Sequence, residues 1–123
     1  MLESKLCITL TNHNFKAEVL HAQTPVLVDC WASWCGSFHQ INPIYNELAL
    51  EFSGQITIGR LDIATAEPLA TQYGIRAVPT LLLFHNGQVL ERLIGSVSKP
   101  KLTCKLKALL SASHVCRSLI ACL

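Results

Sequence analysis

Apolar residues along the chain fall in short runs separated by segments of helical periodicity, and this alternation predicts an α/β domain. Residues 6–10 are apolar and β-branched, which indicates a short strand. Residues 26–31 and 56–62 are nearly continuous apolar runs, as strands covered on both faces would be. Two further strands are expected at residues 80–84 and 89–94.

Four other segments place apolar residues three or four positions apart, as amphipathic helices do. These positions are Phe15, Val19 and Leu20; Ile41, Ile44, Tyr45, Leu48 and Phe52; Leu69, Ala70 and Tyr73; and Leu102, Leu106, Leu109 and Leu110. The four leucines of the last helix are expected to face inward. Pro43 should kink the second helix, whereas Pro68 suits the first turn of the third.

The last two strands flank Asn86 and Gly87, a pair that favours a type I′ hairpin because both central residues need positive φ. The order of elements is therefore βαβαβαββα, which predicts one mixed sheet with helices on both faces. We find no repeat and no linker. We expect one domain over residues 1–112 and a C-terminal extension over residues 113–123.

Composition narrows the class of protein. The chain has 123 residues, of which 50% are hydrophobic and 15% are charged, so a disordered or low-complexity chain is excluded. The net charge of +2 is too weak to indicate a nucleic-acid partner. Residues 96–123 carry five basic side chains and no acidic one. This bias fits either a solvated helix face or an anionic partner.

The sequence shows no sign of a targeting or membrane segment. Residues 1–5 include an acidic side chain where a signal peptide has basic ones, and no apolar core follows them. The longest clean apolar run, residues 81–84, is too short to span a bilayer. We therefore expect a cytoplasmic protein without a transmembrane segment.

The six cysteines are too widely spaced for the common metal sites. They are Cys7, Cys30, Cys35, Cys104, Cys116 and Cys122. No two are separated by only two residues, which excludes zinc ribbons, zinc fingers and a Cys-x-x-Cys redox pair. No metal and no other cofactor is expected.

The most informative stretch is residues 31–39, which leave a buried strand and enter a helix. Cys35 would lie at the helix N-terminus, where free N–H groups and the helix dipole favour a thiolate and lower the thiol pKa. His39 follows four residues later on the same helical face, and Trp34 provides an apolar surface beside the thiol. These features indicate a reactive cysteine; the alternative is an inert surface thiol.

These motifs closely resemble the thioredoxin family, and the resemblance covers residues 6–110. Residues 28–36 (Val-Asp-Cys-Trp-Ala-Ser-Trp-Cys-Gly) are similar to the strand that enters the family's redox loop. Residues 73–81 are similar to the segment that carries its cis-proline, residues 84–87 to its hairpin, and Gly95 to its late glycine.

The resemblance implies a thioredoxin fold, with a central mixed sheet of about five strands flanked by four helices. It also implies that Pro79 is cis and lies against the thiol. A shallow apolar groove that docks a substrate polypeptide would be formed by Trp34, Gly36, Val78, Pro79 and Gly95. The family resemblance suggests a monomer.

The sequence departs from the family at the redox loop. Thioredoxins carry Cys-Gly-Pro-Cys followed by Lys, whereas this chain has Cys35-Gly36-Ser37-Phe38-His39. The attacking cysteine is kept, but Phe38 replaces the resolving cysteine. The two-electron reductase cycle therefore cannot run at this loop alone. Ser37 also removes the conformational restriction of the proline.

Asp29 corresponds to the family's buried carboxylate and is, with Cys35, a candidate catalytic residue. Burial would raise its pKa and allow it to relay protons. Arg60 occupies the position of the family's lysine and is expected to pair with Asp29. The alternative is that Asp29 is a structural remnant.

The other cysteines have separate interpretations. Cys7 and Cys30 fall on core strands, and no role is expected for Cys104 on the last helix. Cys116 and Cys122 lie beyond the thioredoxin resemblance. Their segment could supply a resolving thiol, a docking stripe or a lipidation site, or be a simple extension.

Two functions from different classes fit the sequence. The first is a monothiol thiol–disulfide oxidoreductase that acts on protein disulfides or mixed disulfides through Cys35. An external thiol such as glutathione, or a thioredoxin reductase, would complete its cycle. The alternative is a non-catalytic binding module that uses the groove around Trp34 and Pro79. A glutathione-ligated iron–sulfur carrier is disfavoured, because monothiol glutaredoxins have Cys-Gly-Phe-Ser in a different sequence context.

Overall fold

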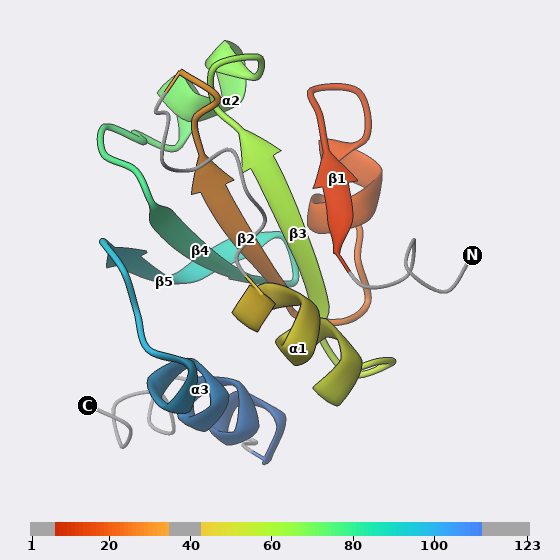
Figure 1. Ribbon diagram of the computed structural model, residues 1–123. Helices are drawn as coiled ribbons and strands as arrows, with labels where there is room; N and C mark the ends of the chain where they lie inside the picture. Colours follow the sequence, from red (N-terminus) through yellow and green to blue (C-terminus); the bar gives the residue numbers. More distant parts are fainter. Residues whose placement is uncertain (1–6, 35–42, 112–123) are drawn as a thin grey trace.

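The computed structural model describes residues 7–34 and 43–111. Its five strands form one mixed sheet in the spatial order β1-β3-β2-β4-β5 (Figure 1). The strands are β1 (Ile8–Leu10), β2 (Val26–Trp31), β3 (Thr57–Asp62), β4 (Thr80–His85) and β5 (Gln88–Ile94). Strand β3 is parallel to β1 and β2, whereas β4 is antiparallel to β2 and β5. The predicted α/β class with a five-stranded mixed sheet is confirmed.

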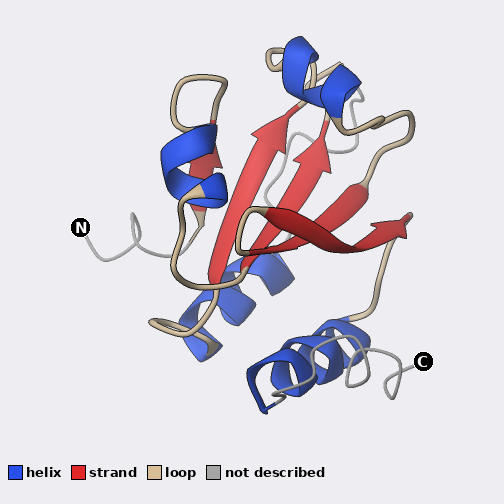
Figure 2. Ribbon diagram, turned by 180° about the vertical axis from the view of Figure 1, so that it is seen from behind, coloured by secondary structure: helices blue, strands red, loops and turns tan. Residues whose placement is uncertain are grey.

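Helical segments cover both faces of this sheet (Figure 2). They are the single π-helical turn η2 (Lys16–Leu20) and the helices α1 (Pro43–Glu51), α2 (Glu67–Gln72) and α3 (Lys99–Ser111). Helices α1 and α3 pack on one face, and η2 and α2 on the other. The kink expected at Pro43 depends on residues that lie outside the described part of the chain.

The alternation of side chains along β2 divides the core in two. Leu27 packs in the cluster of α1 and α3, whereas Val28 and Cys30 pack on the opposite face. On that face Phe15, Tyr73 and Phe84 form a set of tilted and edge-to-face aromatic contacts. Because the pleat alternates, Asp29 points toward the α1 face, and its neighbour Cys30 points away from it.

Helix α3 is fixed to the sheet by apolar and charged contacts. Leu102, Leu106 and Leu109 are buried, and the Nζ of the buried Lys105 donates to Oε2 of Glu91 on β5 at 2.7 Å. The inward orientation expected for Leu110 is wrong, because its side chain is 38% exposed. At 3.6 residues per turn, Leu110 lies about 80° around the helix from Leu102, at the edge of the apolar stripe.

The hairpin between β4 and β5 has the expected turn. Asn86 has φ 54° and Gly87 has φ 79°, the two positive values that a type I′ turn requires. The prediction from the Asn-Gly pair is confirmed.

Candidate functional site

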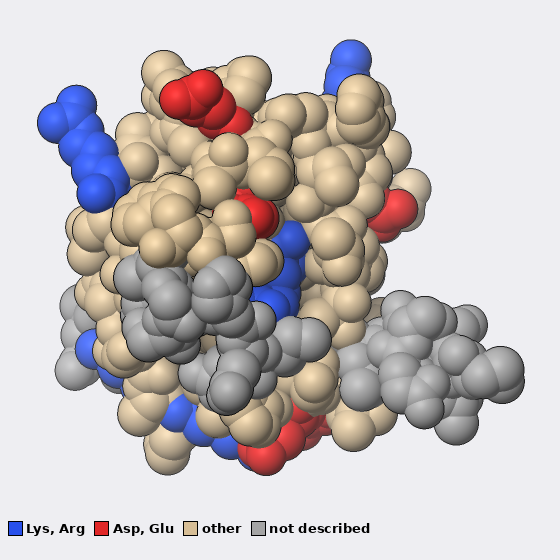
Figure 3. Space-filling view, turned by 45° about the horizontal axis from the view of Figure 1, so that its top comes forward, with Lys and Arg blue, Asp and Glu red and all other residues tan. Residues whose placement is uncertain are grey.

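The candidate site lies at the edge of the sheet where β2 and β3 both end, because parallel strands finish at the same edge. Trp31 ends β2 opposite Asp62, the last residue of β3, and the chain continues through Ser33 to Trp34. Figure 3 turns this edge toward the viewer and shows acidic and basic side chains among the uncharged ones, some of them in the middle of the face.

Asp62 anchors that segment. Its Oδ1 accepts the backbone N–H groups of Ser33 at 3.1 Å and Ala64 at 2.9 Å, and the N–H of Ile63 donates to the carbonyl of Trp31 at 2.8 Å. The path of the chain toward Trp34 is thus fixed by the neighbouring strand. Sequence reasoning missed Asp62, although an acid at the carboxyl end of a parallel strand was a usable signal.

The structure brings Pro79 and Gly95 together. The Val78–Pro79 peptide is cis, as expected, and the N–H of Gly95 donates to the carbonyl of Pro79 at 2.9 Å. The Thr80 hydroxyl donates to the carbonyl of Ala77 at 2.6 Å on the other side of the proline. Hydrogen bonds from both directions therefore hold this turn in place.

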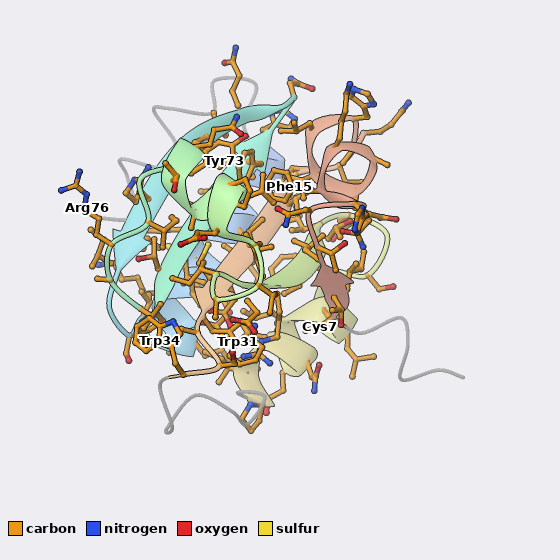
Figure 4. The ribbon with its side chains drawn as sticks, turned by 90° about the horizontal axis from the view of Figure 1, so that it is seen from above. Cys7, Phe15, Trp31, Trp34, Tyr73 and Arg76 are labelled. Carbon is orange, nitrogen blue, oxygen red and sulfur yellow. The ribbon has the colours of Figure 1, made fainter. Side chains whose placement is uncertain are left out.

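Exposed apolar side chains lie at this end of the molecule. Trp34 is 68% exposed, and Val78 and Pro79 are half-buried. Ile94, which pairs with Thr80 in the sheet, is also 68% exposed and was not singled out from the sequence. In Figure 4 Trp34 and Trp31 lie together, away from the aromatic cluster of the opposite face. Large exposed apolar side chains at one end of a molecule are typical of a surface that binds a partner.

The segment before the cis peptide is held by Arg92 of β5. Its Nη2 donates to the carbonyl of Tyr73 at 2.6 Å. A pocket of about 380 Å³ lies along the following residues and includes Gly74 and Arg76 in its lining, with Glu67 of α2 opposite. A basic side chain, Arg76, therefore lies only three residues before Pro79 in the chain.

Asp29 and Arg60 form a buried ion pair on adjacent strands, as the sequence predicts. Arg60 Nε donates to Asp29 Oδ2 at 3.1 Å, and their side chains are only 11% and 4% exposed. The guanidinium also lies over the ring of Trp31, 4.8 Å from its centre. Burial raises the pKa of Asp29 above the ordinary carboxyl value, and the hydrogen bond and charge of Arg60 oppose part of that rise.

Two cysteines of the described chain are free thiols of low reactivity. Cys30 is buried, and burial together with the nearby Asp29 charge raises its pKa to about 12. Burial raises the pKa of Cys7 to about 11, with Arg60 opposing the change. Both pKa values leave a negligible thiolate fraction at neutral pH. Cys104 is different, because it is disulfide-bonded.

The remaining candidates lie outside the described residues. These are Cys35, Gly36, Ser37, Phe38 and His39 of the loop, and Cys116 and Cys122 of the C-terminal segment. Among the residues 7–34 and 43–111, no group of three His, Cys, Asp or Glu side chains is placed to hold a metal ion. No helix in that part of the chain is long and apolar enough to cross a membrane.

The mixed sheet, the cis-proline turn and the exposed tryptophan beside the end of β2 define a fold of the thioredoxin type. Comparison with known proteins agrees: residues 6–108 match the family model of thioredoxin. Thioredoxin C-2 of Corynebacterium nephridii is 40% identical over 99 residues, which cover 80% of this chain and 92% of that protein. Thioredoxin of Pseudomonas aeruginosa is 37% identical over 105 residues, 85% of this chain and 97% of that protein.

A plant relative is also similar. The chloroplastic M-type thioredoxin of Spinacia oleracea is 43% identical over 102 residues, which cover 83% of this chain and 56% of that protein. The chain therefore belongs to the thioredoxin family of redox proteins, and the resemblance seen in its motifs is confirmed.

Proposed function

We propose that the protein catalyses thiol–disulfide exchange through the single nucleophile Cys35, with protein disulfides or mixed disulfides as substrates. The observation that supports this most directly is the arrangement around Trp34. The exposed Trp34 immediately precedes Cys35 and lies at the same end of the molecule as the cis Val78–Pro79 turn and Gly95. A substrate polypeptide would dock on this apolar surface beside the thiol.

A single thiol suits the removal of glutathione from proteins. The Cys35 thiolate attacks the sulfur of the glutathione in a protein mixed disulfide, and the protein leaves as a thiolate that takes up a proton. A glutathione thiolate then attacks the Cys35–glutathione disulfide, which releases oxidised glutathione and regenerates the Cys35 thiolate. The net reaction converts one protein mixed disulfide and one glutathione into a protein thiol and oxidised glutathione. Disulfide isomerisation is equally compatible with one thiol.

External resolution follows from the other cysteines of the chain. Phe38 occupies the position of the resolving cysteine. Cys30 is buried on the face of the sheet opposite to Asp29, and Cys7 and Cys30 both have raised pKa values. Neither is a competent attacking thiol at neutral pH. The proposal therefore assigns resolution to an external thiol such as glutathione, with Cys116 or Cys122 as the alternative resolving thiol, and it fits a reducing compartment such as the cytoplasm.

Asp29 and Arg60 would tune the site in this proposal. A bare buried carboxylate disfavours a nearby thiolate, and the Arg60 guanidinium at 3.1 Å offsets that charge. A carboxyl whose pKa is raised also holds its proton to a higher pH than an ordinary carboxyl does, which favours proton transfer to a departing thiolate. Asp29→Asn should therefore change the pH profile of turnover rather than the affinity for substrate. An unchanged profile would leave Asp29 with a purely structural role.

The primary test is the rate of alkylation of Cys35 as a function of pH, followed by turnover of a glutathionylated peptide with and without glutathione. We expect a Cys35 pKa below about 7.5 and turnover that requires glutathione. Cys35→Ser should abolish both turnover and mixed disulfides with target proteins, and Cys7→Ser is the matched control that should retain them. A Cys35 pKa near 8.5 without turnover would refute the enzymatic proposal.

A second test restores the missing thiol. Phe38→Cys should raise insulin reduction driven by a dithiol well above that of the wild type, because a resolving thiol would then lie beside Cys35. If the folded variant shows no gain, the groove itself does not support catalysis.

The alternative function is that of a binding module that uses the same apolar surface without turnover. The replacement of the resolving cysteine by Phe38 and of the loop proline by Ser37 favours it. Under this alternative, Trp34→Ala would abolish capture of a partner protein, and Cys35→Ser would leave that capture intact.

A further inference from the structure

Helix α3 carries a second, separate surface at the other end of the molecule from the candidate site. Lys105 and the buried leucines face the sheet, and a groove of about 720 Å³ runs along a different side of the helix. Six α3 residues line it together with Glu51 of α1: Lys99, Pro100, Thr103, Cys104, Lys107 and Ala108. Its surface is mainly apolar, because methyl groups, the proline ring and lysine stems make up most of it, and Lys99 Nζ lies 3.8 Å from Glu51 Oε1 within the lining.

One of the residues that line this groove, Cys104, forms a disulfide bond. Cys104 is exposed on α3 and is disulfide-bonded. Cys7 and Cys30 are free thiols, so neither of them is its partner. Three of the six cysteines of the chain remain as candidates for the partner.

The position of Cys104 on α3 favours a disulfide partner in the C-terminal segment, residues 112–123, over one in the redox loop. Cys35 follows Trp34, beyond the carboxyl end of β2, which lies at the top of Figure 1, whereas α3 lies at the bottom. Residues 112–123 instead begin directly where α3 ends and contain both Cys116 and Cys122.

The C-terminal segment has the length and the chemistry to fill the groove. Ser111 lies seven positions after Cys104, about 10 Å along the helix at a rise of 1.5 Å per residue. The five residue steps from Ser111 to Cys116 can extend over about 16 Å, and Cys122 reaches further. The larger aliphatic residues of the segment are Val115, Leu119, Ile120 and Leu123, and the segment carries no acidic side chain.

We propose that residues 112–123 dock in the α3 groove and are locked there by a disulfide between Cys104 and Cys116 or Cys122. The lock makes the docked segment sensitive to redox state. A low-molecular-weight disulfide such as oxidised glutathione accepts two electrons from the two thiols, which lose two protons as the bond forms, and two glutathione molecules are released. Reduction by two glutathione molecules reverses the step and frees the segment. This inference does not depend on Cys35 or on the proposed enzymatic function.

Disulfide mapping of the full chain tests the linkage. The protein is equilibrated with oxidised glutathione, its free thiols are blocked at low pH, and its peptides are identified by mass spectrometry. We expect Cys104 joined to Cys116 or Cys122. A Cys104 that is free, joined only to glutathione, or joined to Cys35 would overturn the proposal.

Proteolysis tests the docking. Arg117 supplies a trypsin site within the segment. We expect its cleavage to be about tenfold slower or more in the oxidised protein than in the reduced protein, because cleavage requires local opening. Cys104→Ser should be cleaved at the fast rate under both conditions. Equal rates in oxidised and reduced wild type would overturn docking.

A groove variant separates docking from simple cross-linking. Thr103→Arg places a long charged side chain in the groove, and Lys101→Arg is the matched control at an exposed α3 position that does not line it. Docking raises the effective concentration of the tail thiol at Cys104 above that of a flexible tether. This effective concentration is measured from the equilibrium between the intramolecular disulfide and glutathione. It should fall about tenfold in Thr103→Arg and stay unchanged in Lys101→Arg. An equal value in both variants would overturn docking in the groove.

Discussion

Removal of the Arg60 guanidinium should destabilise the protein strongly at neutral pH and only weakly in acid. The partner left behind, Asp29, has a side chain that is 4% exposed and accepts the Arg60 Nε at 3.1 Å. Arg60→Met keeps an apolar side chain over Trp31 but leaves this carboxylate without its counter-ion. Breaking a buried pair by removing one partner costs about 3–5 kcal/mol.

Protonation sets an upper limit on that cost. If the unpaired carboxylate is too unfavourable, Asp29 can instead take up a proton in the folded state. With an unfolded-state pKa of about 3.9, protonation at pH 7 costs about 4 kcal/mol, since each pH unit above the pKa adds about 1.4 kcal/mol. The lost cation–π contact with Trp31 adds about 1 kcal/mol. We therefore expect Arg60→Met to lower the free energy of unfolding by about 3–5 kcal/mol at pH 7 and by about 1 kcal/mol at pH 4.

The sign of the pH dependence follows from the direction of the Asp29 pKa shift. Burial raises this pKa, so the folded state holds the proton more tightly than the unfolded state does. The stability contributed by the protonated group is present below the unfolded pKa and is lost as pH rises through the folded pKa. Without Arg60 the folded pKa rises further, so stability continues to fall over a wider pH range.

Urea unfolding followed by tryptophan fluorescence measures the effect, because Trp31 and Trp34 both lie at this end of the sheet. Asp29→Asn removes the charge, so Arg60→Met in that background should cost only about 1 kcal/mol at either pH. The reasoning is refuted if Arg60→Met costs the same at pH 4 and pH 7, or if Asp29→Asn does not reduce its cost.

Three further outcomes are expected elsewhere. Glu91→Ala leaves the Lys105 ammonium, whose side chain is 2% exposed, without its partner, so the free energy of unfolding should fall by about 3 kcal/mol. Lys105→Met removes the buried charge and should lower it by less than about 1 kcal/mol. Equal losses of the two variants in urea unfolding would contradict this reasoning. Gly59→Ala would place a Cβ 2.6 Å from Leu10 Cδ1, so thermal unfolding should show a loss of about 1–3 kcal/mol. With its pKa at about 12, Cys30 should be alkylated at pH 8 about a thousandfold more slowly in the native than in the unfolded protein, and comparable rates would contradict its burial.

Much of the fold could be predicted because its signals are local. Residues 26–31 were expected as a buried strand and are β2 with the same bounds, since a continuous apolar run that is covered on both faces forms a strand. Asn86 and Gly87 predicted the hairpin, because few residues adopt positive φ without strain. The inward orientation predicted for Leu110 was wrong, because the sequence pattern of a helix does not show how far around the helix the buried face extends.

Long-range contacts were harder to predict. The Asp29–Arg60 pair was expected only through the family resemblance, and the part played by Asp62 was missed, because no local pattern indicates that its carboxylate accepts the Ser33 N–H from the next strand. The disulfide bond at Cys104 was missed because the spacing of cysteines along a chain does not reveal which of them meet.

The sequence by itself determined that this is a thioredoxin-family domain whose redox loop carries Cys35 without a neighbouring thiol, because residue identity alone settles which side chain stands at position 38. The tertiary structure alone decided which groups meet: the carbonyl of Pro79 with the N–H of Gly95, Asp62 with Ser33, and the apolar groove around Cys104. The physical reason is that strand order and helix packing join residues far apart in sequence, whereas the hydrophobic pattern records only which face of each element is buried.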